Sequence, residues 1–349
     1  MLAHENPSVQ YRRATLFGMS FVTSGLHHVT AIASRPQGNI EFYVRFLGLR
    51  LVKRTVNYDD PQTYHLYFGD ALGRPGSVAS FFAWPGAGPA VRGAGEAVAA
   101  ALRVPPGSLA LWADRLEQHG LQHGYKERFG EEIIAFDDPD GVPLELIEAP
   151  LKGSVPENWP DSPVAAAMAV QGVHSVTVLA PALDETAELL EGLGLHHAAE
   201  APETGEDGTR RRRVRLAAGD HQTASYVELL EVPRPQPGRL GAGSIHHLAL
   251  RVKDDDALQA AHEHLGELGL SPTKTKNRNY FKSVYFKEPG GAIFELATDG
   301  PGFTVDEAPD ELGLAFKLPA WLESERDFLR GRLPVTASPE YSDRFGPQE

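Results

Sequence analysis

The sequence contains no cysteine among its 349 residues. This absence excludes disulfides, thiolate nucleophiles and cysteine-ligated zinc or iron–sulfur sites, so any metal must be bound by histidine and carboxylate groups. The sequence also lacks an apolar run of about 18 residues, which a membrane-spanning helix needs. A basic balance is absent as well, because 33 Lys and Arg against 47 Asp and Glu give a net charge of −14. That charge disfavours nucleic acids and anionic membranes as partners.

The length and composition of the chain set its broad class. The chain is long enough for two domains, and its 42% hydrophobic and 23% charged residues are ordinary for a soluble globular protein. Residues 1–24 contain no apolar segment of the signal-peptide kind, so we expect a loosely ordered leader, with Met19 as an alternative start. The expected location is then the cytoplasm, and the sequence leaves a homo-oligomer open.

A repeat runs through the chain. The segments EAVAAALRV at residues 96–104 and SIHHLALRV at residues 244–252 share one frame, and only the second contains histidines. Similar segments begin at residues 25 and 172. Each alternates apolar with small or polar residues, as a half-buried strand does, and each precedes a helical pattern and several short strands. The sequence therefore predicts an α+β fold of four βαβββ modules. Four such modules in one chain resemble the vicinal-oxygen-chelate superfamily, and this resemblance implies that the modules pair into two cup-shaped sheets.

The segments between these repeats give the expected boundaries. Modules 1 and 2 occupy residues 25–150, a Pro- and Ala-rich linker follows at 151–171, and modules 3 and 4 occupy 172–300. Residues 301–349 hold one amphipathic helix and a polar tail. The expected helices are Asn39–Leu47, Leu109–His119, Leu183–Gly192, Ala257–Leu268 and Ala320–Gly331.

Strand alternation predicts which side chains point into a cup, because successive residues of a strand face opposite sides of the sheet. In the fourth opening segment Leu248 and Leu250 share an apolar face, so His247 lies on the inward face. His28 has the same position in the first segment. In the last predicted strand Glu295 stands between two apolar neighbours and also faces inward.

These inward side chains form a metal-binding set only if the first and fourth modules pair. That pairing brings together two histidines and one carboxylate, which is the ligand set of non-haem Fe(II) oxygenases. The alternative interpretation is that the histidine pairs are unrelated core or surface residues. The equivalent inward positions elsewhere are Ser80, Ala99, Glu145, Ser175 and Glu228. We therefore expect the second cup to be metal-free and structural. We expect His174 to be a structural residue or a residue that supports the site from behind.

Five motifs resemble the hydroquinone-cleaving dioxygenases, which include the chlorohydroquinone 1,2-dioxygenases. They are Leu26-His-His-Val-Thr30, Leu51-Val-Lys-Arg-Thr-Val56, Tyr64-His-Leu-Tyr-Phe-Gly69, Ile245-His-His247 and Asn277-Arg-Asn-Tyr-Phe281. That group belongs to the vicinal-oxygen-chelate superfamily, together with glyoxalases, extradiol dioxygenases and bleomycin-binding proteins. The resemblance implies Fe(II), with Mn(II) as the alternative, on His28, His247 and Glu295. It also implies a small aromatic substrate and O2.

The resemblance further implies a set of residues around the substrate. Those with expected catalytic roles are His27, His246, Tyr285 and Arg278, and those expected to bind substrate are Thr30, Arg278, Tyr285 and Phe82. Strand alternation alone sends His27 and His246 away from the cup, so their role rests on the resemblance. We expect Phe81, Phe82 and Trp84 to contribute to the floor of the cup.

The favoured function is therefore an extradiol-type dioxygenase that opens the ring of a para-dihydroxy aromatic compound. A glyoxalase-type isomerase or lyase is the first alternative, but it typically has a fourth protein ligand, and Ser80 at that position is a poor one. The second alternative is a ligand-sequestering protein, which the two histidines and Glu295 disfavour. The ring substituents of the substrate are not determined by the sequence.

Overall fold

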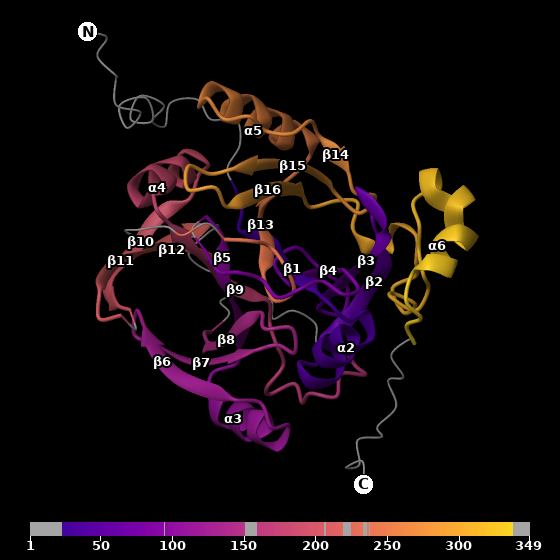
Figure 1. Cartoon of the computed structure of the whole chain (residues 1–349), viewed down its shortest axis with the longest axis horizontal. Helices are drawn as coiled ribbons and strands as arrows, with labels where there is room; N and C mark the ends of the chain where they lie inside the picture. Colours follow the sequence, from indigo (N-terminus) through magenta and orange to yellow (C-terminus); the bar gives the residue numbers. More distant parts are fainter. Residues whose placement is uncertain are drawn as a thin grey trace.

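The computed structural model of the protein describes residues 23–93, 95–150, 159–205, 207–218, 225–232, 236 and 238–337. Most of the predicted leader, the first part of the 151–171 linker and the last residues of the tail lie outside these ranges. Within them the chain forms the expected α+β fold of four βαβββ modules, followed by a C-terminal segment (Figure 1).

Each module begins with a long strand and a helix and then adds three more strands. Module 1 consists of β1 (Leu26–Ala33), α2 (Pro36–Ile40) with a π-helical extension η1 (Glu41–Phe46), β2 (Arg50–Asn57), β3 (Asp60–Gly69) and β4 (Val78–Ala83). Module 2 consists of β5 (Ala97–Val104), α3 (Leu109–Gln118), β6 (His123–Arg128), β7 (Glu131–Asp137) and β8 (Pro143–Glu148).

The second half of the chain repeats this order. Module 3 consists of β9 (Val173–Ala180), α4 (Leu183–Gly192), β10 (His196–Thr204), β11 (Arg210–Ala218) and β12 (Ser225–Glu231). Module 4 consists of β13 (Ile245–Val252), α5 (Asp255–Glu267), β14 (Lys276–Asn277), β15 (Lys282–Lys287) and β16 (Ile293–Thr298). The expected helix at 183–192 has the predicted bounds, and those at 109–119 and 257–268 differ by one or two residues at their ends.

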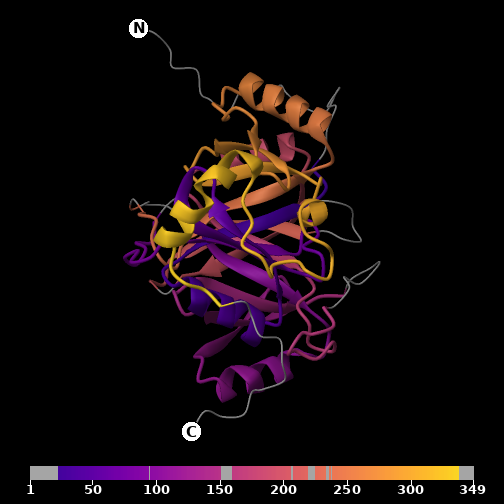
Figure 2. The same ribbon diagram turned by 90° about the vertical axis from the view of Figure 1, so that its right-hand side faces the viewer.

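The pairing of the opening strands joins modules that are distant in sequence. Strand β1 pairs antiparallel with β13, and β5 pairs antiparallel with β9. Modules 1 and 4 therefore form one cup, and modules 2 and 3 form the other. The two cups are parts of one 16-stranded sheet in the described chain, because Ile245 of β13 also pairs with Ala97 of β5. Figure 2 shows the helices α3 and α5 at opposite ends of this sheet.

The core lies between the sheet and its helices. The outward faces of the opening strands contribute apolar residues such as Leu248 and Leu250, both fully buried. Helix α3 buries Trp112 and Leu116 from its apolar face, and each such side chain contributes roughly 1.5–3 kcal/mol of transfer free energy. Phe81 belongs to this core, where its ring centroid lies 4.4 Å from that of Tyr43. The expectation that Phe81 lies on the floor of the cup is therefore wrong, because adjacent residues of β4 face opposite sides.

The C-terminal segment packs against module 1. Its expected single helix at 320–331 is divided into a 3-10 helix, η3 (Ala320–Glu325), and α6 (Arg326–Arg332). A fully buried lysine of β2, Lys53, is paired with Asp306 at 2.6 Å and with Glu307. A buried ammonium group requires such partners, so these ion pairs fix the segment to the edge of the first cup.

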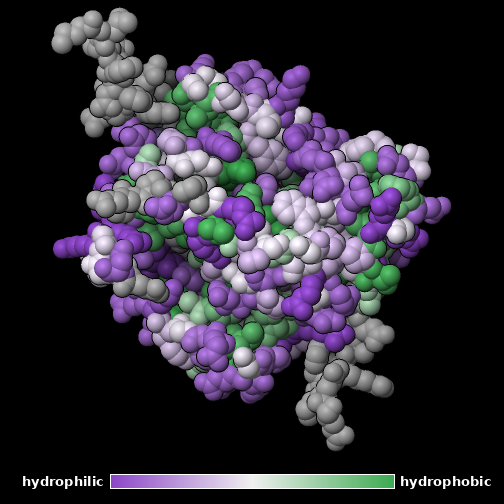
Figure 3. Space-filling view, in the orientation of Figure 1, coloured by the Kyte–Doolittle hydropathy of each residue, from purple (hydrophilic) through white to green (hydrophobic). Residues whose placement is uncertain are grey.

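The face in Figure 3 is mostly hydrophilic, and its apolar groups form separate small patches, as is ordinary for globular proteins. None of the helices in the described part of the chain combines the length and apolar character needed to cross a bilayer.

Candidate metal centre

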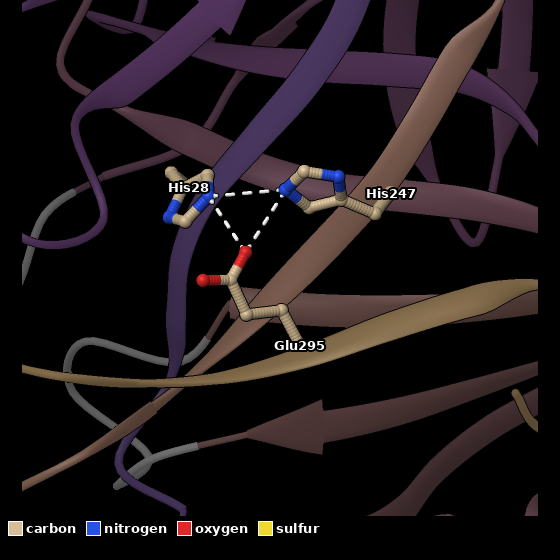
Figure 4. Close-up of side chains that lie close together, drawn as sticks. All are labelled: His28, His247 and Glu295. Carbon is tan, nitrogen blue, oxygen red and sulfur yellow. Dashed lines mark hydrogen bonds and ion pairs between the residues drawn. The ribbon is translucent and has the colours of Figure 1, made fainter. Parts of the chain in front are cut away.

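Three side chains from different strands converge at the centre of the first cup (Figure 4). Glu295 Oε2 lies 3.2 Å from His28 Nε2 and 2.9 Å from His247 Nε2, and the two nitrogens are 3.4 Å apart. The side chains are at most 2% exposed. Strand register explains the convergence: His247 pairs with Thr30 of β1, and Ala249 pairs with Glu295 of β16.

Hydrogen bonds behind His28 determine which of its nitrogens is free to bind a metal. His27 Nε2 lies 3.1 Å from the carbonyl oxygen of Thr298, which can only accept, so His27 carries its proton on Nε2. Burial and the neighbouring His28 lower the pKa of His27 to about 3, so the ring is neutral and its Nδ1 is an acceptor. That Nδ1 lies 2.9 Å from His28 Nδ1. His28 Nδ1 must then donate, which leaves a lone pair on Nε2.

The second histidine of the candidate centre has a similar partner. His246 Nδ1 lies 2.8 Å from His247 Nδ1, so the Nε2 atom of His247 is again the one that faces Glu295. Burial, together with His247, lowers the pKa of His246 to about 3. Metal-bound histidines commonly have such a hydrogen bond on the other ring nitrogen, which fixes the ring and its tautomer.

The carboxylate itself points to a cation. Glu295 is fully buried, and neither of its oxygens has a hydrogen-bond donor among the described residues. Burial raises the pKa of Glu295, and positive charge on the His28 and His247 rings, or hydrogen bonds from them, holds it well below its usual range. When the two rings are neutral and face Glu295 with lone pairs, a bound cation has to supply that positive charge instead. A buried, ionised carboxylate facing two nitrogen lone pairs is costly unless a cation lies between them. The three residues are also the group of His, Asp and Glu in the described chain whose atoms fit one metal ion.

A narrow cavity borders this centre. Its lining residues are His28, Asn57, Tyr58, His65, Tyr67, Phe82, His247, Arg278, Phe281 and Tyr285. It has room for about one water molecule. Three residues expected at the substrate, Phe82, Arg278 and Tyr285, lie on this wall. The Tyr285 ring centroid is 5.4 Å from that of His247, and Arg278 Nε donates to the Tyr285 hydroxyl at 3.2 Å.

The other residues expected at the substrate do not line this cavity. His27 and His246 stand behind the two ligand histidines rather than on the cavity wall, and His27 is the unpaired residue of a β-bulge between Leu26 and His28. Such a bulge re-aims a side chain. Thr30 is fully buried and hydrogen-bonded to Ser80 at 2.8 Å.

Sequence reasoning missed five residues of the cavity wall, which are Asn57, Tyr58, His65, Tyr67 and Phe281. His65 and Tyr67 alternate with the buried apolar residues Leu66 and Phe68 in β3, and their cross-strand partners in β4 are Phe82 and Ser80. The same alternation that selected His28 identifies His65 and Tyr67 as inward-facing residues, so the signal was present in the motif at 64–69.

The second cup has a different polar interior. Arg128 donates to both oxygens of Glu145, at 3.1 and 2.6 Å, and its Nε lies 2.7 Å from Glu228. Two further arginines, Arg213 and Arg215, also bond Glu228, at 2.9 and 2.7 Å. Guanidinium groups therefore balance the two inward carboxylates of this cup.

The remaining expected structural histidine lies in the same cup. His174 Nε2 lies 3.4 Å from Glu131, and burial lowers the pKa of His174. This contact involves neither Glu145 nor Glu228.

The model of the Glyoxalase/Bleomycin resistance protein/Dioxygenase superfamily matches residues 25–146 and 172–296. The chain belongs to this superfamily. The superfamily is also called the vicinal-oxygen-chelate superfamily, and its fold accounts for the four modules. A crystal structure of a "putative dioxygenase" from Bacillus subtilis, 37% identical, superposes with a TM-score of 0.83 and covers 91% of this chain and 99% of that one.

Superfamily members of similar length have names that refer to ring cleavage. "Putative ring-cleaving dioxygenase MhqO" of Bacillus subtilis (strain 168) is 39% identical over 90% of this chain and 98% of its own length. "Chlorohydroquinone/hydroquinone 1,2-dioxygenase" of Sphingobium indicum is 35% identical, over 87% of this chain and 94% of its own length. The crystal structure of glyoxalase I from Zea mays is 16% identical, with a TM-score of 0.57, and covers 79% of this chain and 92% of its own. At this identity, the similarity shows only a common fold.

Proposed function

We propose that this superfamily member is a metal-dependent dioxygenase that opens the ring of a hydroquinone-type aromatic compound and incorporates both atoms of O2. The observation that supports it most directly is the buried set of His28, His247 and Glu295. Two imidazole nitrogens and one carboxylate oxygen face one another in this set. The similarity to ring-cleaving dioxygenases over most of the chain supports the reaction class.

Fe(II) is the proposed metal, and Mn(II) is the alternative. Two imidazoles and one carboxylate with open positions suit either ion and are typical of non-haem Fe(II) oxygenases. When bound, such a metal favours ionisation of a phenol and supplies the redox chemistry that O2 requires. The proposed ligands are His28 Nε2, His247 Nε2 and Glu295 Oε2.

The other side chains around the centre have separate proposed tasks. His27 and His246 hold the ligand rings in one orientation through their Nδ1 contacts. The phenol of Tyr285 remains protonated because burial raises its pKa, so it donates a hydrogen bond toward the reacting oxygen atoms. Arg278 provides a positive charge for an ionised substrate or product. Phe82 and Phe281 exclude water and pack against the ring.

The surroundings of Ser80 support a dioxygenase over a glyoxalase-type isomerase. Ser80 has the position of a fourth ligand, yet its hydroxyl bonds Thr30 at 2.8 Å and His65 at 3.0 Å. A hydroxyl held in this way leaves three protein ligands and open metal positions, which substrate and O2 require.

The test is oxygen uptake after anaerobic loading with Fe(II), measured with hydroquinone and with catechol. We expect uptake with hydroquinone and one O2 consumed per ring opened. Glu295→Gln should lose both bound iron and uptake, whereas Glu145→Gln in the second cup serves as the matched control and should keep both. A wild-type protein that binds iron but consumes no O2 with either substrate contradicts the proposal.

A further inference from the structure

A chain of four hydrogen-bonded side chains runs from β1 through β4 to β3 beside the metal centre. Thr30 Oγ1 lies 2.8 Å from Ser80 Oγ, Ser80 Oγ lies 3.0 Å from His65 Nε2, and His65 Nδ1 lies 2.9 Å from the Tyr67 hydroxyl. We call these four residues the relay. Its His65 and Tyr67 end lines the cavity that also contains His28 and His247. The relay therefore has one end in the cavity and the other in the buried interior.

The relay has one orientation in which the Tyr67 oxygen at its cavity end can accept a hydrogen bond. A neutral imidazole has one donor and one acceptor nitrogen, and each hydroxyl both donates and accepts. If Tyr67 donates to His65 Nδ1, then His65 Nε2 donates to Ser80, and Ser80 donates to Thr30. In that orientation the Tyr67 oxygen retains lone pairs for a donor in the cavity. Every member of the relay then has a partner.

We propose that the Tyr67 and His65 end of the relay binds the hydroxyl of the substrate that lies para to the metal-bound one. This inference rests on the proposed function. The two hydroxyls of a para-diphenol lie at opposite ends of the ring, so only one can reach a metal bound by His28 and His247. The other hydroxyl is buried in a cavity lined mainly by aromatic side chains. A buried hydroxyl without a partner costs about 1–3 kcal/mol, and the Tyr67 oxygen is positioned to be that partner.

The relay selects for ligands with a second hydroxyl. A site with an acceptor placed for the para hydroxyl favours hydroquinone over an analogue that lacks this hydroxyl, because only hydroquinone forms the additional hydrogen bond. Phenol retains the metal-binding hydroxyl and lacks the para one. We therefore expect the relay to control how much more tightly the protein binds hydroquinone than phenol. This difference in affinity can be measured without any catalytic turnover.

The experiment compares the binding of hydroquinone and of phenol by calorimetry, under anaerobic conditions, in the Fe(II)-loaded protein. Tyr67→Phe removes the terminal hydroxyl and keeps the ring. We expect it to weaken hydroquinone binding about tenfold and to leave phenol binding unchanged. Tyr64→Phe is the matched control, because Tyr64 is in the same strand and its hydroxyl bonds Pro334 O at 3.1 Å. It should leave both affinities unchanged.

Three results would overturn the inference. They are a wild-type protein that binds hydroquinone no more tightly than phenol, a Tyr67→Phe variant that weakens both ligands equally, and one that weakens neither. Loss of the preference in Arg278→Met but not in Tyr67→Phe would assign the para hydroxyl to Arg278 instead. Failure of the proposed function is separate: wild-type protein would then show the binding preference without consuming O2.

Discussion

The Nδ1 atoms of His27 and His28 lie 2.9 Å apart, and His27 is held from its other side by the Thr298 carbonyl at 3.1 Å. This arrangement connects β1 to the end of β16, the strand that also contains Glu295. The orientation of one proposed ligand therefore depends on the strand that supplies another.

Replacing His27 should weaken the metal site without removing a ligand. In His27→Ala, His28 loses the acceptor that fixes its tautomer, and we expect the affinity for Fe(II) or Mn(II) to fall about 10–100-fold. Metal titration with the anaerobic protein measures the change. His174→Ala is the matched control, because His174 has the corresponding position in module 3 and contacts Glu131 instead. Equal affinities in the wild type and His27→Ala would contradict the assignment.

A second prediction concerns access to the cavity. Asp59, in the turn between β2 and β3, bonds Arg278 at 2.8 Å and Lys276 at 2.9 Å. These contacts join modules 1 and 4 beside the cavity, which in this conformation holds about one water molecule. A substrate that enters the cavity from this side must therefore displace this wall. We expect Asp59→Asn to raise the dissociation rate of an aromatic ligand by about fivefold, the range of an exposed ion pair.

Stopped-flow measurement at low and high salt tests this effect. The wild-type rate should rise with salt and approach the Asp59→Asn rate, because exposed ion pairs are screened. Asp60→Asn at the neighbouring position is the control and should leave the rate unchanged. Equal rates for wild type and Asp59→Asn at low salt would exclude a role for this contact.

The buried arginine of the second cup gives a stability prediction. The side chains of Arg128, Glu145 and Glu228 are 9%, 5% and 0% exposed. Arg128→Met removes the positive charge that pairs with the buried carboxylates of Glu145 and Glu228. We therefore expect a loss of about 3–5 kcal/mol in the free energy of unfolding. Urea unfolding measures it. The exposed ammonium group of Lys126 lies 4.0 Å from Glu145. Lys126→Met should therefore lower the free energy of unfolding by less than about 1 kcal/mol. Similar losses in both variants would refute the prediction.

Glu131 predicts how stability depends on pH. Burial raises its pKa, but hydrogen bonds with His174 and Arg215 outweigh burial and lower the pKa from 4.5 to about 2. A carboxyl group whose pKa is lowered by folding stabilises the protein above its unfolded pKa, and this contribution disappears as the pH falls toward 2. We expect Glu131→Gln to be less stable than the wild type by about 2–3 kcal/mol at pH 6. The difference should shrink to about 1.5 kcal/mol near pH 3 and to less than about 0.5 kcal/mol near pH 2. A difference that does not depend on pH would contradict this prediction.

Much of the fold and of the candidate site follows from local sequence pattern. The four opening strands lie within one residue of the predicted segments, since alternation of apolar and polar residues is a local property with a period of two. The same period selects His28, His247 and Glu295 as inward-facing residues. Their convergence required only that β1 and β13 be adjacent, because register then brings the inward side chains together.

The sequence by itself determined the residue types of the proposed metal ligands, their strands and their inward faces. Only the tertiary structure decided what surrounds them: the Nδ1 contacts behind the ligands, the relay from Thr30 to Tyr67, the Asp59 contacts with module 4, and the arginines that fill the second cup. These contacts join residues up to about 220 positions apart. Alternation determines which face a side chain is on, but cross-strand pairing over long distances determines which atoms come within hydrogen-bond distance.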